Sequence, residues 1–178
     1  MDRTHQDWLQ LSDEELLSHC DKKEVKGSGK GGQKRNKTSN GIQLRLQSWQ
    51  VQETHSRSRL ENQKKALKKL KLVIAGDLWV DKMPRKGYQD PIPPLKGYIQ
   101  AGVLRINEKN NQFPWLLACL LDALLKLGVK GVAEALDTSS SQIARFFERN
   151  PAHMASFRQI QEYGRSISHA HGAAPKSR

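Results

Sequence analysis

Apolar and polar residues alternate along the stretch Gly41-Ile42-Gln43-Leu44-Arg45-Leu46, which predicts a strand with one buried face and one exposed face. Residues 48–53 continue the alternation, with Trp49 and Val51 on one face, and are expected to form the hairpin partner of this strand. In residues 58–73, apolar side chains recur at helical spacing on one side and lysines on the other. The sequence therefore predicts a short sheet covered by one basic amphipathic helix, which is an α+β arrangement.

Three elements are expected upstream of this hairpin. Ser12 and Glu15 have the spacing of a capping box, which predicts a short helix over residues 13–20. Residues 22–26 are a candidate strand. Residues 27–32 contain four glycines in six positions and are predicted to be a loop.

The second half of the chain is predicted to be helical. Prolines and glycines interrupt residues 76–112, where only residues 103–106 are expected to form a short strand. A helix should begin at Pro114 and end at Gly128. Helices over residues 131–136 and 140–149, joined by a three-residue turn, have helix-turn-helix spacing, and a plain helical bundle is an equally weighted alternative.

These elements suggest four segments. We expect an α+β domain over residues 1–75 and a Pro/Gly-rich connector over residues 76–112. An all-α, helix-turn-helix-like domain should occupy residues 113–165, its last helix ending near Gly164, and residues 166–178 should form a disordered tail.

The net charge of +12 is concentrated in two short blocks. Residues 22–37 contain seven basic residues and one acidic residue, and residues 57–71 have the same balance. The rest of the chain is close to neutral. Such blocks indicate a face that binds a polyanion, with nucleic acid as the expected partner, whereas a merely solubilising pattern would intersperse both signs.

Several other functional classes have little support. The longest apolar stretch, residues 115–127, is broken by Asp122 and Lys126 and is too short for a membrane span. The polar N-terminus resembles no secretory signal, and Cys20 and Cys119 form no disulfide framework, so a cytoplasmic location is expected. Residues 27–32 match a dinucleotide-binding pattern formally, but the required preceding apolar strand and following helix are missing.

One motif carries specific chemistry, Gly29-Lys30-Gly31-Gly32-Gln33-Lys34-Arg35-Asn36-Lys37-Thr38. Two consecutive glycines let a backbone adopt conformations closed to other residues and approach a substrate closely. A backbone N–H placed in this way can stabilise the oxyanion that forms when water attacks an ester carbonyl.

This motif resembles the GGQ loop of peptide chain release factors and of their small rescue relatives, which hydrolyse peptidyl-tRNA on stalled ribosomes. The following strand and the positions Arg57-Ser58, Asn62 and Lys64 on the basic helix extend the likeness over roughly residues 11–73. The chain departs from the family at Arg35, where valine is usual, at Gly41, where alanine is usual, and at Arg59-Leu60, where Gln-His is usual.

The resemblance implies roles for individual residues. Gly31 and Gly32 would permit the loop geometry, and the backbone amide of Gln33 would stabilise the oxyanion. The side chain of Gln33 would position water near the terminal ribose of the tRNA. The residues expected to contact large-subunit ribosomal RNA and the tRNA acceptor end are Lys26, Lys30, Lys34, Arg35, Asn36, Lys37, Arg57, Arg59, Lys64, Lys65, Lys68 and Lys69. No metal or cofactor is implied, and a methyltransferase of the kind that modifies this glutamine in some relatives is a candidate partner.

The expected activity is ribosome-dependent hydrolysis of the peptidyl-tRNA ester at the peptidyl-transferase centre. Stop-codon decoding is not expected, because the sequence shows no counterpart of the family's codon-reading domain. The alternative is a non-catalytic factor that docks on ribosomal RNA and recruits a partner through its helical domain. A third hypothesis is a nucleic-acid regulator that acts through residues 140–149.

Overall fold

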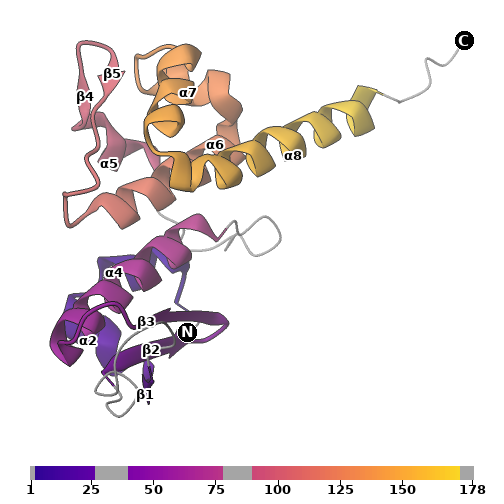
Figure 1. The fold of residues 1–178 in the computed structure, drawn as a ribbon. Coiled ribbons are helices and arrows are strands. Elements are labelled where there is room, and N and C mark those ends of the chain that lie inside the picture. The colour runs from indigo at the N-terminus through magenta and orange to yellow at the C-terminus, as the bar shows by residue number, and fades with distance from the viewer. Residues whose placement is uncertain (1–2, 27–39, 78–89, 173–178) are drawn as a thin grey trace, which may run out of the picture. The chain divides into compact units, whose positions relative to one another are not determined.

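A computed structural model of the chain describes residues 3–26, 40–77 and 90–172, with only the backbone described for residues 165–172 (Figure 1). The described residues form a mixed α and β structure, as expected. The chain divides into two compact units, Met1–Ala75 and Gly76–Arg178. No helix in the described ranges is both long enough and apolar enough to cross a membrane.

The first unit contains a three-stranded antiparallel sheet in the order β1-β2-β3. Its strands are β1 (Asp21–Val25), β2 (Gly41–Leu46) and β3 (Trp49–Glu53), so all three strand predictions are confirmed to within one residue. Ile42, Leu44 and Leu46 are buried on one face of β2, as the alternation predicted.

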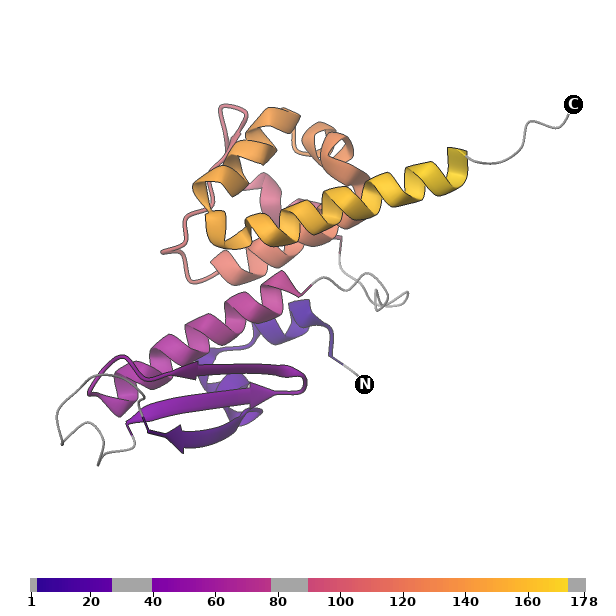
Figure 2. The same cartoon turned by 45° about the vertical axis from the view of Figure 1, so that its right-hand side comes forward.

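Helix α4 (Arg59–Gly76) lies along one face of this sheet (Figure 2). Its buried stripe follows positions four residues apart, at Asn62, Ala66, Leu70 and Ile74. Leu60 and Val73, two of the apolar residues expected on the buried side, are 62% and 40% exposed. The expectation was wrong because the buried line begins at the polar Asn62, which hydropathy alone assigns to the surface.

Two short helices precede the sheet. The capping box at Ser12 and Glu15 is confirmed and begins α2 (Asp13–Ser18), which ends two residues before Cys20. The sequence analysis did not predict α1 (His5–Gln10), which Thr4 caps through a second capping box.

The second unit begins with elements inside the segment expected to be a connector. These are α5 (Ile92–Lys96) and a hairpin of β4 (Ile99–Gln100) and β5 (Val103–Leu104). Helix α5 packs against α6 (Phe113–Ala135), and β5 packs against α7 (Ser140–Arg149). Because Leu95 and Leu104 are buried, the described part of this segment contributes to the core of the second unit.

The helices of the second unit follow the predicted order. Helix α6 is interrupted at Gly128, whose φ of 67° and ψ of 175° are non-helical, where the sequence predicted a helix end. A 3₁₀ turn (Pro151–His153) and α8 (Met154–Gly172) follow α7. The rings of Phe147 and Phe157 stack with their centroids 4.3 Å apart and join α7 to α8.

Helix α8 continues beyond its expected end near Gly164. The expectation of disorder from residue 166 is therefore wrong as far as Gly172. Glycine lowers helix propensity by only about 1 kcal/mol relative to alanine, so it weakens a helix without ending it.

Candidate functional site

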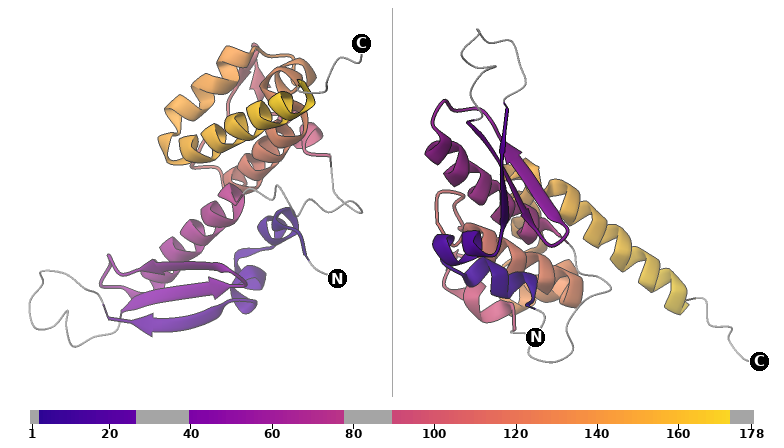
Figure 3. Two further views of the ribbon diagram at one scale, coloured as in Figure 1. Left: turned by 90° about the vertical axis from the view of Figure 1, so that its right-hand side faces the viewer. Right: turned by 90° about the horizontal axis from the view of Figure 1, so that it is seen from below.

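The catalytic residues expected from the motif, Gly31, Gly32 and Gln33, lie outside the described residues, as do Lys30, Lys34, Arg35, Asn36 and Lys37. The structure describes both ends of the segment that carries them. Strand β1 ends at Val25 and β2 begins at Gly41, and these two residues are paired in the antiparallel ladder. The two chain ends therefore lie side by side at one end of the sheet, where the pairing of β1 with β2 stops (Figure 3).

Gly41 occupies a position where the surrounding atoms leave no room for a side chain. A Cβ at this position would lie 2.6 Å from Cγ2 of Thr54 and 2.7 Å from the carbonyl oxygen of Val25. Ordinary van der Waals contacts begin at 3.4 Å. The carbonyl oxygen of Val25 and the side chains of Val25 and Thr54 therefore occupy the space that a side chain at Gly41 would need.

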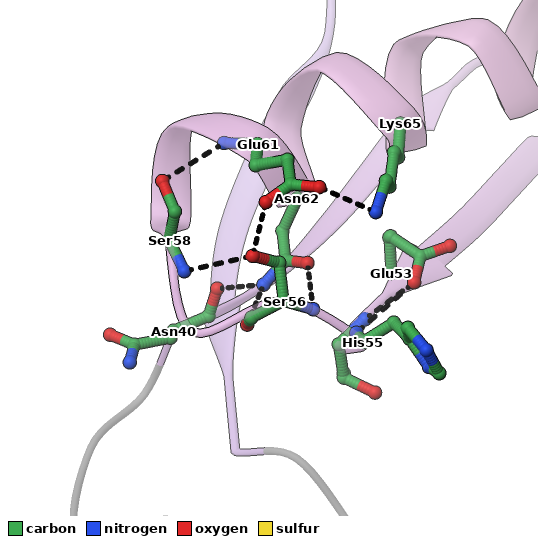
Figure 4. Close-up of polar contacts among 9 residues, drawn as sticks. Asn40, Glu53, His55, Ser56, Ser58, Glu61, Asn62 and Lys65 are labelled. Atoms are coloured by element: carbon green, nitrogen blue, oxygen red, sulfur yellow. Dashed lines mark hydrogen bonds and ion pairs between the residues drawn. The ribbon is translucent and has the colours of Figure 1, made fainter.

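Asn62 connects the C-terminal end of this segment to the start of α4 (Figure 4). Its Nδ2 donates hydrogen bonds to the carbonyl oxygens of Asn40, at 2.7 Å, and Ser56, at 2.8 Å. Its Oδ1 accepts a hydrogen bond of 2.8 Å from the Ser56 amide. The residue is fully buried, and this network satisfies both of its amide protons.

A second set of polar contacts orders the turn before α4 (Figure 4). The Ser58 amide donates to Oγ of Ser56 at 3.0 Å, and that hydroxyl donates to the Glu61 carboxylate at 2.5 Å. Lys65 pairs with the same carboxylate at 2.7 Å. The hydrogen bond from Lys65 is the main cause that lowers the pKa of Glu61, and Glu61 in turn raises the pKa of Lys65.

The expected RNA-contacting cations of α4 divide into two groups. Arg59 pairs with Glu24 of β1 at 2.6 Å, and Nζ of Lys69 donates to the Gln52 carbonyl at 3.3 Å. Lys65, Arg59 and Lys69 are therefore already engaged within the first unit. All five side chains are exposed, but Lys64 and Lys68 form no hydrogen bond or ion pair with other described residues. Lys26 and Arg57 are also exposed, at the end of β1 and before α4.

The helix-turn-helix hypothesis concerns α7. Ser139 caps this helix by accepting a hydrogen bond of 3.2 Å from the Gln142 amide. Ile143, Phe146 and Phe147 are buried, and Ser140, Ser141 and Arg145 are exposed. Glu148 shares the exposed surface with Arg145, so α7 does not present a purely cationic face.

The surroundings of both cysteines disfavour the thiolate form. Burial raises the pKa of Cys119 to about 12 and also raises the pKa of Cys20. Within the described ranges, no group of three His, Cys, Asp or Glu side chains could hold a metal ion.

Sequence reasoning placed Asn62 on the basic helix but did not find its buried contacts. A signal was available, because Asn62 lies four residues before Ala66 and eight before Leu70 on the apolar stripe. A polar residue in such a stripe indicates a buried hydrogen-bonding group.

Comparisons with known protein families, with curated proteins and with solved structures found no match to this chain.

Proposed function

We propose that this protein is a cytoplasmic, ribosome-dependent peptidyl-tRNA hydrolase that releases nascent peptides without decoding a stop codon. The main support is the Gly-Gly-Gln tripeptide at residues 31–33, in a segment whose two flanking strands are paired at its base. The exposed cations Lys26, Arg57, Lys64 and Lys68 on neighbouring elements suit a ribosomal RNA target.

The proposed reaction is hydrolysis of the ester between the peptide and the terminal ribose of the tRNA. Water attacks the ester carbonyl carbon, and the Gln33 backbone N–H stabilises the negative charge on the carbonyl oxygen. The bond from this carbon to the ribose oxygen then breaks, and that oxygen leaves with a proton. The products are a peptide with a free carboxyl group and a deacylated tRNA.

The Gln33 side chain has a different role in this proposal, because it positions the attacking water next to the ribose. Gly31 and Gly32 allow the backbone to approach the ester closely enough for the Gln33 amide to reach the oxyanion. Loss of one oxyanion donor typically lowers a rate by about 10²–10³-fold.

The test is peptide release from purified ribosomes that hold peptidyl-tRNA on a message without a stop codon. The full-length wild type is compared with Gln33→Ala and Gly32→Ala, and ribosome binding is measured in parallel. Matched controls are Gln50→Ala, at an exposed position of β3, and Gly97→Ala, where the space around a new Cβ is open. Release that falls by about 10²-fold or more only in the two loop variants, with binding retained, supports the hydrolase.

Binding of the wild type without release would contradict this proposal. It would favour the non-catalytic docking factor, in which the basic first unit binds ribosomal RNA and the helical second unit recruits a partner. A methyltransferase that modifies glutamine is proposed as a further partner, acting at Gln33, and mass spectrometry of the loop peptide from native cells tests this modification.

A further inference from the structure

We infer that Asn62 is a positioning residue for the hydrolysis proposed above, and this inference rests on that proposed function. It holds the end of the motif-bearing segment at a fixed place relative to helix α4. Its distinguishing feature is that one buried side chain hydrogen bonds to both the residue before β2 and the turn before the basic helix.

The geometry leaves the Asn62 side chain little freedom. The residue is fully buried, and its three hydrogen bonds of 2.7–2.8 Å use both amide protons and the carbonyl oxygen. Removing such a side chain leaves the partly buried carbonyl groups of Asn40 and Ser56 without this donor, which is more costly than the loss of an exposed hydrogen bond. The carbonyls of Asn40 and Ser56 are therefore held in place by a group on a rigid helix.

The hydrogen bond from Asn62 reaches Asn40 just beyond the point where strand pairing holds the backbone. The paired residues of β1 and β2 extend only to Val25 and Gly41, and Asn40 comes immediately before that last pair. The sheet ladder therefore fixes the chain up to Gly41, and Asn62 extends this fixation by one residue toward the motif.

The same side chain also sets the start of α4. The Ser56 that it holds donates to Glu61, and Glu61 pairs with Lys65 on the next turn of the helix. Asn62 thus couples the end of the proposed catalytic segment to the element that carries Lys64 and Lys68. A displacement at this junction would move Asn40, to which the proposed catalytic segment is joined, relative to Lys64 and Lys68 on α4.

Ester hydrolysis is sensitive to such displacements. An oxyanion donor acts only when it lies within hydrogen-bond distance of the developing charge, and a shift of about 1 Å can lower a rate by about 10²-fold. We therefore expect loss of the Asn62 amide to reduce the release rate without weakening ribosome binding, because the exposed cations remain in place.

The experiment compares Asn62→Ala with two controls in the full-length protein. Leu70→Ala removes a fully buried side chain two turns further along α4 and destabilises the same unit without touching Asn40. Asn150→Ala removes another buried asparagine, whose Nδ2 donates to the Phe146 carbonyl at 2.6 Å in the second unit. Single-turnover release at saturating ribosome concentration and the ribosome dissociation constant are measured at a temperature where all variants are folded.

The expected result is a release rate about 10²-fold lower for Asn62→Ala, with a dissociation constant within about threefold of wild type. Leu70→Ala and Asn150→Ala should keep release within about threefold of wild type, because a lower stability does not change the geometry of molecules that remain folded. Release by Asn62→Ala within threefold of Leu70→Ala would overturn the inference.

Hydrogen exchange separates this inference from the proposed function. In Asn62→Ala, the amides of Gly41 and Ser56 should exchange faster than in Leu70→Ala, relative to the other amides of the first unit. Equal exchange in the two variants overturns the anchoring role even if the wild type is an active hydrolase. Absence of release by the wild type refutes the proposed function and with it the catalytic part of the inference, while the exchange contrast still decides whether Asn62 anchors the segment.

Discussion

Gly41→Ala should destabilise the first unit although it adds only one methyl group. The new Cβ would lie 2.6 Å from Cγ2 of Thr54, 2.7 Å from the carbonyl oxygen of Val25 and 2.9 Å from Cγ2 of Val25. These distances fall short of the ordinary contact limit of 3.4 Å by 0.5 to 0.8 Å. Because one of these atoms belongs to the backbone, the strands themselves must separate to relieve the overlap.

The magnitude follows from the cost of overpacking. An additional methyl group in a closely packed site costs about 1–3 kcal/mol, and we expect about 2 kcal/mol here. Native-state hydrogen exchange followed by mass spectrometry measures this loss for each unit of the full-length chain. A loss of about 2 kcal/mol accelerates exchange through unfolding by about 30-fold. We expect this acceleration in peptides of the first unit, including β2 and α4.

Two further variants test the reasoning. Thr54→Ser removes the Cγ2 methyl, so it should restore part of the lost stability in a Gly41→Ala background, while the overlap with the Val25 carbonyl persists. Gly97→Ala is the matched control, because its φ of −63° suits alanine and no atom lies within 4 Å of the new Cβ. Exchange in Gly41→Ala within threefold of wild type would refute the reasoning, and full restoration by Thr54→Ser would show that the Val25 carbonyl does not contribute.

Three other predictions concern charge, pH and the second core. The double variant Lys64→Gln, Lys68→Gln should make the fall of the logarithm of the RNA-binding constant with the logarithm of salt concentration less steep by about 1.5. The ammonium of Lys71 pairs with Asp13 at 2.6 Å, so Lys71→Gln should leave this steepness unchanged. Burial lowers the pKa of His153 below 6.5, so the unfolded chain binds more protons than the folded one and stability should fall as the pH drops through 6.5. Between pH 7.5 and pH 5.5, the melting temperature of His153→Gln should therefore fall less than that of the wild type. Phe147→Ala, which removes the stacked contact with Phe157, should cost about 3–5 kcal/mol in denaturant unfolding, and a cost below about 1 kcal/mol would contradict the packing described for α7 and α8.

The sequence predicted the helices and strands that are determined by interactions between residues close together in the chain. Alternation gave β2 and β3, and the capping box at Ser12 gave the start of α2, because these signals depend on neighbours within a few residues. Helix α1 was missed because its capping box has Asp7 in place of the usual glutamate or glutamine. The extension of α8 past Gly164 was missed because a glycine was given the role of a helix end.

The candidate site was predictable in its residue types but not in its contacts. The basic blocks and the motif could be located from the sequence, whereas the pairing of Arg59 with Glu24 depends on a register between β1 and α4 that composition does not reveal. The role of Asn62 depends in the same way on the carbonyls of Asn40 and Ser56, which come together only in the folded first unit. Long-range polar contacts of this kind are determined by tertiary structure and not by local pattern.

The internal contacts of α4 also change how its charge should be interpreted. The block at residues 57–71 contains seven basic residues, which suggests a highly charged RNA-binding helix. Four of them, Arg59, Lys65, Lys69 and Lys71, instead contact Glu24, Glu61, the Gln52 carbonyl and Asp13. A cation that already neutralises a carboxylate releases fewer counterions from RNA, so the helix should contribute fewer phosphate contacts than its composition suggests. Binding that depends on Lys64 and Lys68 but is insensitive to Arg59→Gln would support this division, and equal losses of affinity from all three positions would contradict it.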